Sequence, residues 1–218
     1  MKRLERGSLY VITDPKAQKG RSHLHVLTEA VRGGASIVQL RDKEAPDEVL
    51  ISVGKVLRKV CDRFKALLIV NERIHVAKAV SADGLHIGQE DISLPEARKK
   101  LGRGTLLGVS THSLAQARAA VREGADYIGV GPIFKTPTKP DYLPVGIELI
   151  REIRKEMQVP FVAIGGINLS NVKDVLTAGA YSIAVVRAVV GQEDVYEATQ
   201  KLKTVLDSWR QSSERKDE

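Results

Sequence analysis

The sequence predicts a single-domain (β/α)8 TIM barrel, the α/β fold in which eight parallel strands close on themselves inside a ring of helices. Short apolar runs recur along the chain, and most of them are followed by a segment with helical periodicity. Glycine also recurs where a helix gives way to the next strand. Eight such units in about 210 residues make a compact barrel, and an open doubly wound sheet is the alternative.

The expected strands are short stretches of the chain with strand character. They are mostly continuous apolar runs rather than alternating ones, as expected when both faces of a strand are covered. In chain order they are Leu9–Thr13, Ser36–Leu40, Leu67–Asn71, Gly84–Ile87, Thr105–Val109, Tyr127–Val130, Phe161–Ile164 and Ser182–Val186.

The expected helices lie between these strands and repeat their apolar residues with helical spacing. They are His23–Val31, Asp47–Arg63, Leu114–Glu123, Gly146–Met157, Leu169–Thr177 and Val195–Arg210. Three Gly-Ala pairs, at Gly34, Gly124 and Gly179, each end a helix and open a strand, and Ala82-Asp83-Gly84-Leu85 is a looser example. Residues 1–210 are therefore expected to form the barrel, and the polar residues 211–218 a disordered tail.

The composition is ordinary for a globular protein, and a cytoplasmic location is expected. The chain has 218 residues, of which 43% are hydrophobic and 28% charged. No apolar run approaches the roughly 18 residues that cross a bilayer, so no membrane contact is expected. Met1–Gly7 is too polar for a signal peptide, and the single Cys61 excludes an internal disulfide.

The net charge of +7 raises the question of nucleic acid. However, the basic residues are scattered among acidic ones, and aromatic residues, on which bases stack, make up only 4% of the chain. The expected partners are therefore small phosphorylated molecules and not nucleic acid. A homo-oligomer is left open by the sequence.

Cationic and amide groups gather after the second strand. Side chains in a strand alternate between its two faces, so Gln39, Arg41 and Lys43 are expected to share one face, while Leu40 packs on the other. Two cations and an amide on one side of a strand end suit a phosphate or diphosphate. A solvated edge strand is the alternative.

Two carboxylates follow neighbouring strands on the face where barrel enzymes place their sites. Glu72 follows the third strand and Asp91 the fourth, and both are expected near the cations Arg41, Lys43 and Lys139. Plain ion pairs are one interpretation. We favour Mg2+, which binds proteins through one or two carboxylates together with substrate phosphate oxygens.

A second anion site is predicted at the last two strands. Gly165-Gly166 follows strand seven and Val186-Arg187 ends strand eight, where many barrels bind phosphate. The hydroxyls of Thr136 and Thr138 strengthen this interpretation. Two anion sites suggest two phosphorylated substrates.

The histidines indicate no metal centre. His86 is interpreted as a packed, hydrogen-bonded residue of an apolar strand, whereas His112 follows strand five and is a candidate for proton transfer. His23, His25 and His75 fall in helical segments without metal-ligand spacing.

Taken together, these segments resemble the thiamine-phosphate synthase family. The resemblance covers most of the chain, from Tyr10 to Arg187. It rests on Gln39-Leu40-Arg41-Asp42-Lys43, His86-Ile87-Gly88-Gln89-Glu90-Asp91, Gly108-Val109-Ser110-Thr111-His112 and Gly131-Pro132-Ile133-Phe134-Lys135-Thr136-Pro137-Thr138-Lys139, in this order.

The resemblance implies a Mg2+-dependent transferase. It would join hydroxymethylpyrimidine diphosphate to hydroxyethylthiazole phosphate, or to the carboxylated thiazole, and release diphosphate. Ser110 and Lys139 would act at the reacting centre, and Glu72 and Asp91 would hold Mg2+. The residues that would bind the pyrimidine diphosphate are Gln39, Arg41, Lys43, Asn71, Ser110 and Lys139. Those that would bind the thiazole phosphate are Thr136, Thr138, Gly166, Val186 and Arg187.

Two positions depart from the family pattern. Glu72 stands where aspartate is usual, and Arg187 where a small hydroxyl residue is usual. Two alternatives remain open: the related thiazole tautomerase, which has no diphosphate to hold, and a barrel that binds phosphorylated ligands without catalysis.

Overall fold

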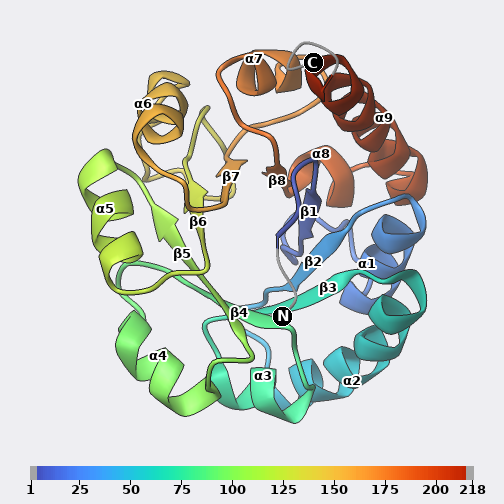
Figure 1. The fold of residues 1–218 in the computed structure, drawn as a ribbon. Coiled ribbons are helices and arrows are strands. Elements are labelled where there is room, and N and C mark those ends of the chain that lie inside the picture. Colours follow the sequence, from blue (N-terminus) through green and yellow to red (C-terminus); the bar gives the residue numbers. More distant parts are fainter. Residues whose placement is uncertain (1–3, 215–218) are drawn as a thin grey trace.

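The computed structural model describes residues 4–214. Eight parallel strands close into a barrel in chain order, with β8 pairing back to β1, which confirms the predicted fold (Figure 1). The strands are β1 (Leu9–Ile12), β2 (Ile37–Leu40), β3 (Leu67–Asn71), β4 (Gly84–Ile87), β5 (Leu106–Thr111), β6 (Tyr127–Val130), β7 (Phe161–Ile164) and β8 (Ile183–Val185).

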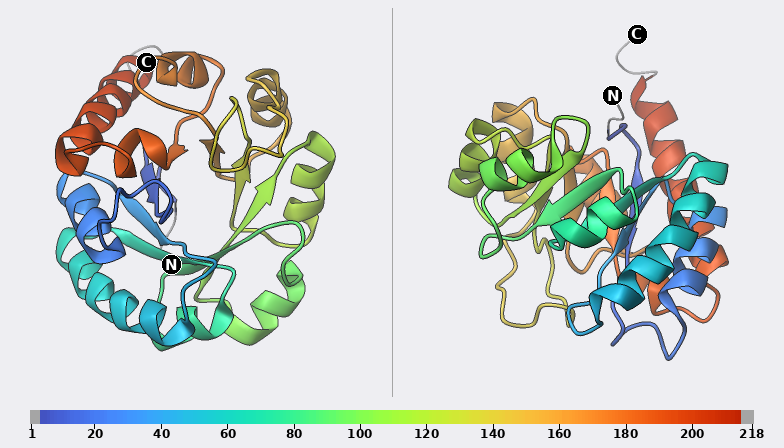
Figure 2. Two further views of the ribbon diagram at one scale, coloured as in Figure 1. Left: turned by 180° about the vertical axis from the view of Figure 1, so that it is seen from behind. Right: turned by 90° about the horizontal axis from the view of Figure 1, so that it is seen from below.

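The helices surround this barrel as an outer ring (Figure 1). They are α1 (His23–Arg32), α2 (Asp47–Phe64), α3 (Ile74–Ala79), α4 (Leu94–Leu101), α5 (Leu114–Arg122), α6 (Glu148–Glu156), α7 (Val172–Thr177), α8 (Arg187–Val190) and α9 (Val195–Glu214). The side view in Figure 2 shows the segment between β6 and α6 projecting beyond the strands at one end. Within residues 4–214, no helix is long and apolar enough to span a bilayer.

The strand ends differ from the prediction in two places that matter for the site. β5 continues to Thr111 because Ser110 and Thr111 pair with Gly129 and Val130 of β6. β8 ends at Val185, so Val186 and Arg187 follow the strand and begin α8 instead of ending the strand.

Several helix boundaries also differ. α7 begins at Val172 and not at Leu169, because the Asn168 side chain accepts the N–H of Ser170 in a preceding turn, with N···O 2.8 Å. α6 begins at Glu148, after Gly146 in the left-handed region at φ +75°. α9 continues to Glu214, so residues 211–214 are helical and not a disordered tail, while residues 215–218 lie outside the described part.

Three helices, α3, α4 and α8, are absent from the predicted list. α3 and α8 have six and four residues, too few for a clear helical period. The start of α4, by contrast, was recognisable in the sequence. Ser93 caps this helix by accepting the N–H of Glu96, as in the Ser-x-x-Glu pattern of a capping box.

The core has two layers because side chains alternate between the two faces of each strand. Leu9 and Val11 of β1 point outward and pack under the helices, whereas Tyr10 and Ile12 point into the barrel. Burying one such large apolar side chain stabilises the fold by about 1.5–3 kcal/mol. Gly108 makes room for the inner layer, since a Cβ atom there would lie 2.1 Å from Cζ of Tyr127.

Candidate active site

A cavity of about 310 Å³ opens at the carboxyl ends of the strands, the end where barrel enzymes bind their substrates. Most of the predicted site residues line it. They are Gln39, Arg41, Asn71, Ser110, Thr136, Thr138, Lys139, Gly166, Val186 and Arg187. Lys43, Glu72 and Asp91 do not line this cavity.

Lys139 is the centre of a group of charges at the cavity wall. Burial lowers the pKa of its ammonium group, and the positive charges of Arg41 and Lys43 lower this pKa further. Asp91 and Glu72 act in the opposite direction, so both carboxylates lie close enough to influence the Lys139 charge. The structure therefore brings the five predicted charged residues together, with cations in excess.

Arg41 presents its side chain from a rigid backbone. The Thr13 hydroxyl accepts the Arg41 N–H at 2.7 Å and lies 2.9 Å from the Arg41 carbonyl oxygen. Within residues 4–214, the Arg41 guanidinium has no hydrogen bond or ion pair of its own. The backbone of Arg41 is held by Thr13, and its guanidinium is available to an anion in the cavity.

Lys43 lies beyond the strand to which the alternation argument applies. β2 ends at Leu40, and the Asp42 carboxylate accepts the N–H groups of Glu44 and Ala45, which bends the chain into a turn. The Lys43 side chain is consequently 59% exposed, and its ammonium lies 3.8 Å from Oε2 of Glu72 at the edge of the site.

The two carboxylates are held by different local structures. Glu72 has left-handed backbone geometry at φ +49°, and its Oε2 accepts the Asn71 side-chain amide at 2.8 Å. Oδ2 of Asp91 accepts the Gly88 N–H at 2.6 Å. In each carboxylate the other oxygen has no hydrogen bond within the described residues. Each can therefore offer one oxygen to a cation.

A chain of hydrogen bonds crosses the barrel interior beneath the cavity. The Gln39 amide donates to the Tyr10 hydroxyl at 2.5 Å, and the hydroxyls of Tyr10 and Tyr127 are 3.3 Å apart. His86 continues this chain, with Nδ1 3.1 Å from the Tyr127 hydroxyl and Nε2 2.9 Å from the Ser110 hydroxyl. Burial, and to a lesser degree the Lys139 charge, lower the pKa of His86 to about 4, so the imidazole is neutral near pH 7.

The opposite wall of the cavity has the features of a compact anion site. Gly166 has φ +66°, and a Cβ atom there would lie 2.7 Å from the Lys135 carbonyl oxygen, so only glycine fits without strain. Oγ1 of Thr138 is buried and has no hydrogen-bond partner in the described part of the chain. Arg187 is exposed at the start of α8 and forms no ion pair among the described residues. This wall therefore offers unused polar groups to a ligand.

The family to which the chain belongs follows from its similarity to known proteins. The model of the family described as thiamine monophosphate synthase matches residues 9–189. The chain belongs to this family. Thiamine-phosphate synthase of Chloroflexus aurantiacus is 49% identical over 199 residues, which cover 91% of this chain and 92% of the relative. The corresponding protein of Halalkalibacterium halodurans is 45% identical over 200 residues, covering 91% and 95%.

A solved structure agrees with this membership. Thiamine phosphate pyrophosphorylase from Pyrococcus furiosus superposes with a TM-score of 0.87 at 39% identity, covering 93% of this chain and 96% of the other. The predicted family and its enzyme class, a transferase of thiamine biosynthesis, are thereby confirmed. The roles of the individual site residues remain predictions.

Two histidines lie in the cavity wall of this family member. His86 is packed and hydrogen-bonded, as the sequence predicted, and it also lines the cavity. His112 lines the cavity too, with Nδ1 hydrogen-bonded to the Gly131 carbonyl and its ring 4.8 Å from the Tyr142 ring. Its proposed part in proton transfer stays a prediction.

The alternation of side chains along a strand predicts which residues can form the hydrogen-bond chain inside the barrel. Leu85 and Ile87 of β4 pack in the outer layer, so His86 between them must point into the barrel. The same rule places Tyr10 inside, between Leu9 and Val11. Both polar side chains were recognisable as interior residues once the barrel was assumed.

Proposed function

We propose that this protein condenses 4-amino-5-hydroxymethyl-2-methylpyrimidine diphosphate with 4-methyl-5-(2-hydroxyethyl)thiazole phosphate, or with its carboxylated form. The products are thiamine phosphate and diphosphate, and the carboxylated thiazole would in addition lose its carboxyl group as carbon dioxide. The observation that carries this proposal is that two walls of one cavity present groups suited to anions, Arg41 and Lys139 on one wall and Thr138 and Arg187 on the other. Family membership supports thiamine phosphate as the product.

The diphosphate is assigned to the wall that holds Arg41 and Lys139. Burial is the largest cause of the lowered pKa of Lys139, and the positive charge of Arg41 lowers it further, so a bound polyanion would offset the repulsion between the two cations. Lys43 lies at the edge of this wall beside Glu72, and its flexible side chain can add a third contact. Gln39, Asn71 and Ser110 border the adjoining part of the cavity and would bind the pyrimidine ring.

The thiazole phosphate is assigned to the opposite wall. The partnerless hydroxyl of Thr138 lies in the same loop as Thr136, whose Oγ1 accepts the Thr138 N–H at 3.3 Å. Gly166, Val186 and Arg187 complete this wall from the ends of β7 and β8. Backbone N–H groups and one guanidinium suit a phosphate monoester.

The chemistry of Glu72 and Asp91 fits Mg2+. Each has one carboxylate oxygen without a hydrogen bond in the described residues, and Mg2+ takes one or two carboxylates with substrate oxygens and waters. No group of three or more His, Cys, Asp or Glu side chains that could hold a metal ion occurs within residues 4–214. When bound, the ion would neutralise charge on the diphosphate. The longer side chain of Glu72 is compatible with this role through its free oxygen.

The reaction then needs positioning and charge stabilisation and no nucleophilic side chain. The bond between the pyrimidine methylene carbon and the diphosphate oxygen breaks, and its electron pair leaves with the diphosphate. Arg41 and Lys139 stabilise that leaving group. The thiazole nitrogen donates its electron pair to the resulting pyrimidinylmethyl cation and forms the new carbon–nitrogen bond. Neutral His86 holds the Ser110 hydroxyl beside the reacting centre.

The test is product formation by the purified protein. Incubation with both substrates and Mg2+ should give thiamine phosphate by mass spectrometry, and omission of either substrate should abolish it. A tautomerase would isomerise the carboxylated thiazole phosphate without using the pyrimidine. A binding protein without catalysis would retain both ligands unchanged, and either of these results would refute the proposal.

A further inference from the structure

We propose that Arg73 is a positioning residue for the diphosphate site, because it fixes the turn between β2 and α2 from which Arg41 and Lys43 project. This inference rests on the proposed function only for the identity of the anion. Arg73 does not line the cavity, and it belongs to neither of the two walls described above.

The Arg73 guanidinium binds the backbone of that turn at several points. Nη1 donates to the carbonyl oxygen of Ala45 at 2.6 Å and to Oδ1 of Asp47 at 2.7 Å. Nη2 donates to the carbonyl oxygens of Lys43 at 2.8 Å and of Asp42 at 3.3 Å. Three carbonyls of one turn and the first carboxylate of α2 thus share one side chain, which is only 19% exposed.

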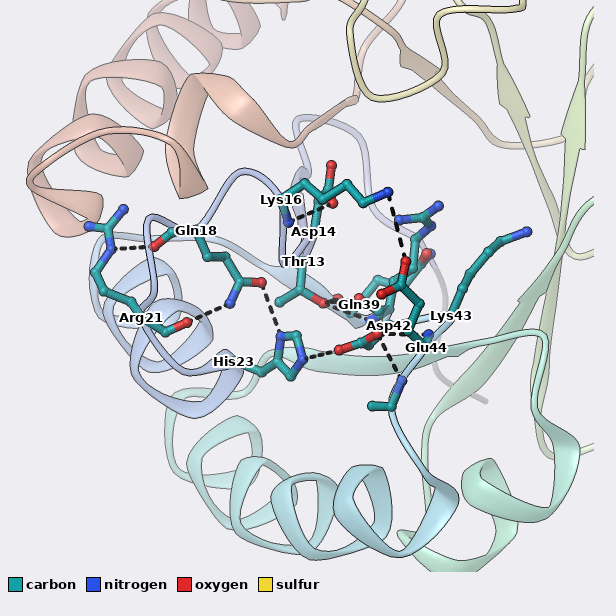
Figure 3. A network of polar contacts seen from close by, with 12 residues as sticks. Thr13, Asp14, Lys16, Gln18, Arg21, His23, Gln39, Asp42, Lys43 and Glu44 are labelled. Carbon is teal, nitrogen blue, oxygen red and sulfur yellow. Dashed lines mark hydrogen bonds and ion pairs between the residues drawn. The ribbon is translucent and has the colours of Figure 1, made fainter.

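The other side of the same turn is held by Asp42. Its carboxylate accepts the N–H groups of Glu44 and Ala45, at 2.9 and 3.0 Å, and lies 3.0 Å from Nε2 of His23 on α1. Figure 3 shows His23 lying between Gln18 and Asp42, while the Lys43 side chain extends away from this network. The backbone is therefore held on both sides, and the two cationic side chains remain available.

The position of Arg73 in the sequence gives the contact a further consequence. Arg73 follows Asn71 and Glu72, the proposed pyrimidine and Mg2+ residues at the end of β3. Its side chain ties that strand end to the turn that carries Arg41 and Lys43. One guanidinium thereby sets the spacing between the proposed acidic and basic parts of the site. Lysine cannot replace it fully, because an ammonium lacks the planar fork that reaches all four oxygens.

The decisive experiment measures binding of inorganic diphosphate with Mg2+ by calorimetry to the full-length wild type, Arg73→Gln and Arg73→Lys. Arg98→Gln is the matched control. Arg98 donates to the carbonyl oxygens of Gly102 and Thr105, at 3.2 and 2.6 Å, and to Asp126. It makes the same kind of contact before β5, at the other end of the barrel. Thermal unfolding of all variants reports any general loss of stability.

Diphosphate binding should weaken about tenfold in Arg73→Gln and less in Arg73→Lys, since small displacements of a binding group have large effects. Arg98→Gln should bind diphosphate as the wild type does, even if its unfolding temperature falls as far as that of Arg73→Gln. In the reaction, Arg73→Gln should raise KM for the pyrimidine substrate and leave KM for the thiazole phosphate unchanged. The effect of Arg73→Gln should shrink in an Arg41→Ala background. Arg73 is proposed to act on diphosphate binding by positioning Arg41, so its effect depends on the Arg41 side chain being present.

Equal diphosphate binding by Arg73→Gln and the wild type would overturn the inference, as would equal losses in Arg73→Gln and Arg98→Gln. Full additivity with Arg41→Ala would also overturn it. A wild type that binds diphosphate but forms no thiamine phosphate would refute the proposed reaction and leave the positioning role to the binding data. A wild type that binds no diphosphate would refute both.

Discussion

Nε2 of His86 lies 2.9 Å from Oγ of Ser110 inside the barrel, where both residues line the cavity. The other ring nitrogen of His86 faces the Tyr127 hydroxyl at 3.1 Å, so both nitrogens are engaged. A neutral imidazole matches this arrangement, because one of its nitrogens donates and the other accepts. The Ser110 hydroxyl is consequently fixed in place by a group that does not titrate near neutral pH.

The lowered pKa of His86 predicts a stability change in acid. The folded-state pKa is about 4, below the ordinary value of 6.5, so the unfolded chain binds the proton more readily between these values. The free energy of unfolding should therefore fall as the pH decreases from about 6.5 to about 4. His86→Gln removes this titration, so the stability difference between wild type and variant should narrow by about 2 kcal/mol from pH 7 to pH 5. Urea unfolding at the two pH values measures it, and a constant difference would show that His86 titrates normally.

Lys139 should limit binding of the pyrimidine substrate at alkaline pH. Burial, with the charges of Arg41 and Lys43, lowers the pKa of Lys139 below its ordinary value of 10.5. The ammonium form is therefore lost at a lower pH than for an ordinary lysine, and KM for the pyrimidine diphosphate should rise there. In Lys139→Arg the cation persists and this rise should disappear. The same alkaline rise in both proteins would mean that another group titrates.

Asp91 should be needed for metal-dependent turnover and not for the fold. Asp91→Asn keeps an oxygen that can accept the Gly88 N–H but removes the negative charge. We expect turnover to fall by about two orders of magnitude or more, as for loss of a group that stabilises leaving-group charge. Glu90→Gln, at the exposed neighbouring residue, is the control and should behave as wild type. Near-normal turnover of Asp91→Asn at saturating Mg2+ would remove Asp91 from the metal site.

Arg187 should contribute to the thiazole phosphate site alone. It is exposed at the cavity edge and lacks an ion pair in the described part of the chain, so its guanidinium can reach a phosphate. Arg187→Ser should raise the apparent constant for thiazole phosphate by an amount equivalent to about 1.5–3 kcal/mol, typical of a hydrogen bond to a charged group. The constant for the pyrimidine substrate, bound across the cavity, is the internal control. An unchanged thiazole phosphate constant would leave only backbone N–H groups in this site.

Strand alternation explains both the success and the limit of prediction from sequence. The apolar runs predicted the barrel and its strand order, and the strand ends predicted the cavity that holds Gln39, Arg41 and Ser110. Alternation does not describe Lys43, which lies beyond the end of β2 in a turn where the Asp42 carboxylate accepts the N–H groups of Glu44 and Ala45. Such turns depend on side-chain contacts that periodicity does not express.

Contacts between distant parts of the chain were also beyond the sequence. Arg73 reaches carbonyl groups about 30 residues earlier, and carbonyl groups are present at every residue, so no residue type marks its partners. His86 could be placed inside the barrel by alternation, but its bond to Ser110 depends on the relative position of β4 and β5. The contact partners of Arg73 and His86 are therefore determined by strand register and turn geometry, which the sequence pattern does not specify.

The central claim is that one cavity joins two phosphorylated substrates and releases diphosphate. Its most direct test is to quantify thiamine phosphate and diphosphate in the same sample after a single turnover with Mg2+. We expect equal amounts of the two products, formed at the same rate, and neither when a chelator is present. Diphosphate release without thiamine phosphate, or turnover of the thiazole substrate without diphosphate release, would contradict the claim.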